Sequence, residues 1–155
     1  MQGFYWLIEG ELAGCSRPGG RGGETLESDL EWLRGQGIAA VVSLTEQPLT
    51  AGACERYGLA ELHLPVVDMT PPTPEQLGAA LEFIDWQLAH GQPVVVHCLV
   101  GQGRTGTVLA AYLIRAGRTP ETALRELRAV CPGAVSAPVQ QRALEAFARR
   151  RDWIV

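Results

Sequence analysis

A thiol and a guanidinium stand on one short segment, in which five residues separate Cys98 from Arg104. A chain of this length can curl so that its backbone N–H groups point inward, and Gly101 and Gly103 permit the backbone angles of such a bend. With a helix N-terminus behind it, a bowl of N–H groups binds a tetrahedral dianion, and an arginine can hold two of its oxygens bidentately. We therefore expect a phosphate site made of Leu99, Val100, Gly101, Gln102, Gly103 and Arg104.

Cys98 at the floor of this bowl is expected to act as a nucleophile. The thiolate is the reactive form of cysteine, and a helix N-terminus or a nearby cation stabilises it. Thr105 could offer its hydroxyl to the thiolate, and His97 is expected to brace the loop by hydrogen bonds instead of acting as a base. The alternative, a buried structural cysteine, explains neither Arg104 nor the glycines. We expect the remaining cysteines to be buried structural residues; these are Cys15, Cys54 and Cys131.

Short apolar strands alternate with amphipathic helices along the chain. We expect strands over residues 4–8, 12–15, 39–44, 60–67 and 93–97, and helices over 25–36, 50–57, 73–88, 107–116, 119–131 and 137–150. This order predicts a single α/β domain over residues 1–155, with a mostly parallel central sheet and helices on both faces. Ligands bind at the carboxyl ends of the strands in such sheets, where residues 93–97 lead into the bowl.

The composition limits the possible partners. The net charge is −4, all thirteen basic residues are arginine, and they form no large cluster, so a nucleic-acid partner is not expected. No apolar run approaches a membrane span, and the first residues lack the features of a signal peptide, so we expect a cytoplasmic protein without a membrane partner. The cysteine spacing predicts neither a metal site nor a disulfide framework. We expect a monomer without cofactor.

The loop resembles the His-Cys-x5-Arg-Thr signature of the protein tyrosine phosphatase superfamily. The chain is most similar to the small, atypical dual-specificity phosphatases of the VHZ type. Besides the loop, the similarity rests on the segments Trp6–Gly14, Val41–Glu46, Val67–Leu77 and Cys131–Val135. It implies a cysteine phosphatase fold and a two-step phosphoryl transfer through phosphocysteine.

Such a transfer needs an acid to protonate the leaving oxygen. Of the four aspartates, Asp29 and Asp85 lie in helix patterns and Asp152 lies in the tail. Asp68 ends a predicted strand and begins a proline-rich loop on the active edge, and the resemblance implies that it is the general acid. The alternative is a solvated loop aspartate.

Two further residues are candidates for supporting roles. Glu46 follows a predicted strand on the same edge and could pair with Arg104, although it could also be a surface glutamate. The segment 131–141 departs from the family, because relatives usually carry acidic or hydroxyl residues soon after Pro-Gly. Gln140 is the best candidate there for orienting the hydrolytic water.

The expected substrate is phosphotyrosine in proteins. The chain is too short for the long loops that form a deep phosphotyrosine slot, so a shallower bowl would also admit phosphoserine and phosphothreonine. A non-protein phosphomonoester, such as an inositol lipid, a sugar phosphate or a nucleotide, is the alternative. The uncharged Leu99, Val100 and Gln102 fit polyphosphoinositides less well. An arsenate reductase and a non-catalytic phosphate-binding module are remoter alternatives.

Overall fold

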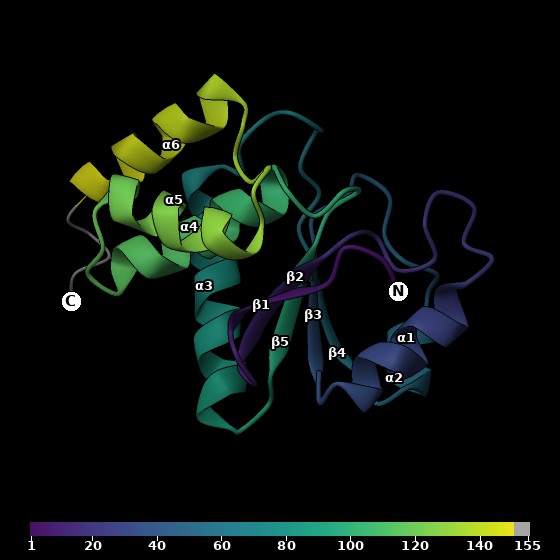
Figure 1. Cartoon of the computed structure of the whole chain (residues 1–155). Coiled ribbons are helices and arrows are strands. Elements are labelled where there is room, and N and C mark those ends of the chain that lie inside the picture. Colours follow the sequence, from purple (N-terminus) through teal and green to yellow (C-terminus); the bar gives the residue numbers. More distant parts are fainter. Residues whose placement is uncertain (151–155) are drawn as a thin grey trace.

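The computed structural model describes residues 1–150, which form a twisted central sheet between two layers of helices (Figure 1). The sheet has five strands in the order β1-β2-β5-β3-β4. β1 runs antiparallel to β2, and the other neighbours are parallel. The strands are β1 (Tyr5–Ile8), β2 (Leu12–Cys15), β3 (Ala40–Ser43), β4 (Ala60–His63) and β5 (Val94–His97). The predicted α/β class is confirmed.

The helices cover the two faces of the sheet unequally (Figure 1). α1 (Leu26–Gly35) and α2 (Ala53–Arg56) lie on one face. The other face carries the larger layer, which consists of α3 (Pro74–Ala89), α4 (Arg104–Arg115), α5 (Pro120–Val130) and α6 (Pro138–Arg149). α4 is buried along nearly its whole length against α3, α5, α6 and the sheet, in keeping with the largely apolar run of its residues 108–114.

The middle strand, β5, is apolar at successive positions because both of its faces are covered. Val94 and Val96 are fully buried in the core under α3 and α4. Val95 is fully buried in the smaller core on the face of α1. This packing fixes the strand whose carboxyl end leads into the segment with Cys98.

Several element boundaries differ from the prediction. α4 begins at Arg104 and not at residue 107, so the arginine belongs to the first turn of the helix. β4 ends at His63 and not at residue 67, because Pro65 has no N–H to continue the ladder. α3 begins as predicted, with a capping box in which the Thr73 hydroxyl accepts from Gln76 N at 3.1 Å. No helix within residues 1–150 is long and apolar enough to cross a membrane.

Candidate active site

Cys98 lies at the floor of the loop between β5 and α4, where its side chain is buried. The backbone N–H of Gly101 donates to its sulfur at 3.3 Å. Gly101 has a φ of +89°, a conformation that side chains disfavour, and a Cβ there would lie 2.5 Å from the carbonyl oxygen of Cys15. The loop therefore needs glycine at this position for two reasons, its backbone angle and its close contact with β2.

Three successive carbonyl groups of this loop accept hydrogen bonds from the N-terminal part of the chain. The donors are Arg17 N to Leu99 O at 3.0 Å, Ser16 Oγ to Val100 O at 2.8 Å and Tyr5 Oη to Gly101 O at 2.7 Å. These bonds hold the carbonyl oxygens on the side of β1 and β2. The repulsion that inward carbonyls would exert on a phosphate is thereby avoided.

His97 is fully buried behind the loop. Its Nδ1 lies 3.2 Å from the carbonyl oxygen of Cys98, and its Nε2 lies 2.7 Å from Ser43 Oγ. Since a carbonyl can only accept, Nδ1 carries the proton and Nε2 accepts from the serine hydroxyl. Burial lowers the pKa of His97 to about 3, and the charges of Arg17 and Arg104 add to this effect. His97 is therefore neutral at physiological pH and braces the loop.

Arg104 is held by the segments that follow β3 and β4, and it is only 2% exposed. Its Nη1 donates to Glu46 Oε1 at 2.7 Å and to the carbonyl of Val66 at 2.8 Å, and its Nη2 lies 3.3 Å from Asp68 Oδ1. Its Nε has no hydrogen-bond partner within residues 1–150. A buried N–H without a partner is costly, so this donor is available to a ligand.

Glu46 connects Arg104 with the loop of Asp68. Its second carboxylate oxygen accepts from the backbone N–H of Asp68 at 3.3 Å. Hydrogen bonds from its own backbone, from Asp68 N and from Arg104 lower the pKa of Glu46, so it remains an anion beside the guanidinium. Asp68 itself is exposed at the pocket mouth and accepts from Met69 N at 2.9 Å.

An open pocket of about 440 Å³ lies beside Arg104. Glu46, Asp68, Leu99 and Arg104 form part of its wall. Thr45, Gln47, Arg17 and Arg21 also line it, and no sequence pattern pointed to the two arginines. The segment 16–23, which follows β2, brings both arginines to the site. The signal available in the sequence was two arginines within a glycine-rich segment that follows a strand.

Thr105 and Gln140 are both buried near the start of α4. The Thr105 hydroxyl has no hydrogen-bond partner in the described part of the chain. Gln140 Nε2 lies 3.4 Å from the carbonyl of Thr70, in the loop of Asp68, and 3.0 Å from the position that a Cβ on Gly103 would take. Gln140 thus bridges that loop and the start of α4.

The other aspartates have different environments. Asp29 accepts from Gly19 N at 2.7 Å, and Asp85 pairs with Arg115 at 2.5 Å on the helical layer. Asp152 lies outside the described residues.

A thiol and an arginine at the two ends of one strand-to-helix loop are characteristic of phosphatases that use cysteine. Residues 13–118 match the family model described as "Polymorphic toxin system, DSP-PTPase phosphatase". The chain belongs to this family, within the superfamily of dual-specificity and tyrosine phosphatases, which are phosphoric monoester hydrolases.

Two curated proteins illustrate the relationship. The chain is 33% identical over 103 residues to "Phosphatidylglycerophosphatase and protein-tyrosine phosphatase 1" of Homo sapiens, which covers 61% of this chain and 51% of the human protein. It is 30% identical over 122 residues to "Phosphatidylglycerophosphate phosphatase PTPMT1" of Arabidopsis thaliana, which covers 76% of this chain and 36% of that protein. The chain therefore spans about half or less of these two relatives.

Solved structures agree with the fold. The crystal structure of Tk-PTP in the active form is 32% identical, has a TM-score of 0.84, and covers 96% of this chain and 97% of its own. The crystal structure of PTPMT1 has a TM-score of 0.82 with 94% of both chains covered; at 24% identity it supports the fold alone.

Proposed function

We propose that the chain hydrolyses phosphomonoesters in two steps through a phosphocysteine. In the first step the Cys98 thiolate attacks phosphorus, a sulfur–phosphorus bond forms, and the bond to the ester oxygen breaks. Asp68 donates its proton to that oxygen. In the second step water attacks phosphorus and gives a proton to Asp68. The sulfur–phosphorus bond then breaks to release inorganic phosphate and the thiolate.

The observation that carries this proposal is the arrangement of donors around Cys98. The Gly101 N–H points at the sulfur, and the Nε of Arg104 is a buried donor without a partner. A phosphate above the sulfur would accept from both and would keep these bonds as its charge shifts toward the transition state. Glu46 is a positioning residue in this account, because it fixes the orientation of the guanidinium.

Thr105 and Gln140 are proposed to act in the second step. Thr105 has a buried hydroxyl with no partner in residues 1–150, and it would donate to the departing thiolate. Gln140 lies between the Asp68 loop and the start of α4, where its amide would orient the attacking water. Both roles are supported by position.

Two classes of substrate, phosphorylated proteins and non-protein phosphomonoesters, remain candidates. Phosphotyrosine in proteins, with phosphoserine and phosphothreonine, is supported by the open pocket at whose mouth Asp68 is exposed. A non-protein phosphomonoester is supported by Arg17 and Arg21, which add positive charge to the same pocket. The names of the human and Arabidopsis relatives, which include phosphatidylglycerophosphate, support it as well. That residues 1–155 form a cytoplasmic monomer without nucleic-acid, membrane or cofactor partners stays a prediction.

Release of inorganic phosphate from a panel of substrates tests the proposal. The panel contains phosphotyrosine, phosphoserine and phosphothreonine peptides, phosphoinositides, phosphatidylglycerophosphate, sugar phosphates and nucleotides. We expect turnover that vanadate inhibits and that Cys98→Ser abolishes. Arg104→Lys should be nearly as inactive as Arg104→Ala, because an ammonium lacks the planar fork of a guanidinium. Full activity of Cys98→Ser would exclude the phosphocysteine route.

A further inference from the structure

Arg17 and Arg21 carry positive charge at the catalytic pocket without a carboxylate partner within residues 1–150. The guanidinium of Arg17 is oriented by three uncharged acceptors, which are Thr45 Oγ1 at 2.6 Å, Gln47 O at 2.8 Å and Pro48 O at 3.0 Å. Arg21 is exposed and makes no hydrogen bond or ion pair with the described residues. The catalytic chemistry described above uses neither of them.

The loop that presents these arginines has a defined shape. Gly20 N donates to the carbonyl of Arg17 at 2.9 Å, and Gly23 N donates to that of Gly19 at 2.8 Å. Asp29 accepts from Gly19 N inside the loop. Burial acts to raise the pKa of Asp29, but this hydrogen bond and those from the N-terminal amine and Thr25 lower it overall, so the anchoring carboxylate stays charged.

The loop is also tied directly to the phosphate loop. The backbone of Arg17 donates to the carbonyl of Leu99, and the neighbouring Ser16 hydroxyl donates to that of Val100. The guanidinium of Arg17 and the loop backbone that carries Arg21 are therefore held beside the bowl before any ligand arrives. Such preorganisation reduces the entropy that binding costs.

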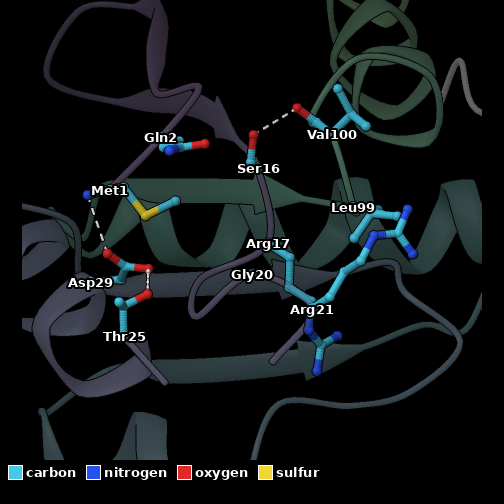
Figure 2. A pocket seen from close by; sticks show the side chains of 10 residues that line it. All are labelled: Met1, Gln2, Ser16, Arg17, Gly20, Arg21, Thr25, Asp29, Leu99 and Val100. Carbon is cyan, nitrogen blue, oxygen red and sulfur yellow. Dashed lines mark hydrogen bonds and ion pairs between the residues drawn. The ribbon is translucent and has the colours of Figure 1, made fainter. Parts of the chain in front are cut away.

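A second pocket, of about 510 Å³, adjoins the catalytic one and shares Arg17, Arg21 and Leu99 with it. Figure 2 shows the side chains of Arg17 and Arg21 on the side of this pocket where Leu99 lies, with Asp29 on the opposite side. A ligand that extends from the catalytic pocket into the second pocket would lie beside both arginines, because both residues line both pockets.

We propose that Arg17 and Arg21 form a subsite for a second anionic group of the substrate, either a phosphate or a phosphodiester. The phosphomonoester that is hydrolysed lies at Cys98 and Arg104, and the second group lies at the entrance to the adjoining pocket. The proposal rests on the proposed function and narrows its substrate to phosphomonoesters that carry a second phosphate. A guanidinium suits this task because its planar fork matches two phosphate oxygens.

Kinetics with matched substrates test the subsite. Alkyl monophosphates are compared with α,ω-alkanediol bisphosphates of increasing length, and with a diacyl lipid in mixed micelles whose phosphodiester carries a terminal glycerol phosphate. The main variant is Arg21→Gln, because Arg21 supports no other part of the fold. Arg125→Gln is the control, since Arg125 is an exposed arginine on α5 in the helical layer of the other face.

We expect Arg21→Gln to lower kcat/KM about five- to tenfold for substrates with a second phosphate, mainly through KM, and much less for monophosphates. Arg125→Gln should change neither. Arg17→Lys keeps the charge but loses the fork, so it should show the same selective loss; circular dichroism establishes that the variant is folded. A preference for the bisphosphates places a free phosphate in the subsite, and a preference for the lipid places a headgroup phosphodiester there. Equal losses on monophosphates and on every substrate with a second phosphate would overturn the proposal.

Binding to the Cys98→Ser variant separates the subsite from catalysis. Calorimetry should show tighter binding of the preferred ligand with two phosphates than of its monophosphate counterpart, and Arg21→Gln should remove this difference. If the parent enzyme hydrolysed none of the substrates, the proposed function would fail, while this binding comparison would still decide whether the subsite exists. Equal affinities for the two ligands in Cys98→Ser would reject it.

Discussion

Replacement of Gly101 by alanine should disable the phosphate loop while leaving most of the fold intact. The added Cβ would lie 2.5 Å from the oxygen and 2.6 Å from the carbon of the Cys15 carbonyl. β2 cannot withdraw easily, because Cys15 pairs with His97 in the parallel ladder of β2 and β5. The phosphate loop must therefore move. It would then lose the hydrogen bond from the backbone N–H of residue 101 to Cys98. The positive φ would in addition lower the free energy of unfolding by about 1–3 kcal/mol.

Gly37→Ala is a matched control for this experiment. Gly37 has a φ of +95°, close to that of Gly101, but a Cβ there would meet nothing within 4 Å. Both variants should lose about 1–3 kcal/mol in urea unfolding from the backbone alone. Only Gly101→Ala should lose kcat, by about 10²-fold or more, because a shift of about 1 Å in a reacting group is enough for such a loss. Near-parental kcat in folded Gly101→Ala, measured with nitrophenyl phosphate, would refute the reasoning.

Three further outcomes are expected. Asp68→Asn should make kcat/KM depend more steeply on the leaving-group pKa across a series of aryl phosphates, because no acid protonates poor leaving groups; equal slopes would assign the proton to another residue. The same variant should bind vanadate about two- to fivefold more tightly, because its neutral amide replaces a carboxylate that competes with the anion for Arg104 Nη2. Weaker binding of vanadate would contradict this. The free energy of unfolding should fall by about 4–5 kcal/mol as the pH drops from about 6.5 toward 3. The reason is that His97 becomes protonated over this range in the unfolded chain, whereas in the folded protein its pKa is about 3 and it stays neutral. His97→Gln should flatten this fall and the exposed His90→Gln should not, whereas equal slopes in the two variants would argue against His97 as the cause.

The sequence predicts the features that local chemistry decides. The Thr-Pro pairs that begin α3 and α5 are predictable because a threonine cap and a proline at the first turn act within a few residues. The buried middle strand follows from its apolar run. Glu46, Asp68 and Arg104 meet because the ends of parallel strands share one edge of the sheet, so residues distant in sequence can be placed together from the fold class alone.

The features that the sequence does not predict depend on contacts between remote segments. The bonds from Tyr5 and Ser16 to the phosphate loop span 96 and 84 residues, and they form only because β2 pairs with β5. The placement of Arg17 and Arg21 depends in the same way on the turns of a glycine-rich loop, for which periodicity gives no signal.

Direct detection of the phosphoenzyme tests the central claim, that Cys98 carries the phosphoryl group between the two steps. The enzyme is mixed with nitrophenyl phosphate, quenched within the first turnovers, and digested for mass spectrometry. We expect one phosphoryl group on the peptide that contains Cys98, a burst of nitrophenolate that matches it in amount, and neither signal in Cys98→Ser. Steady turnover by the parent enzyme with no burst and no phosphorylated Cys98 at any quench time, or a phosphoryl group on another residue, would contradict the account.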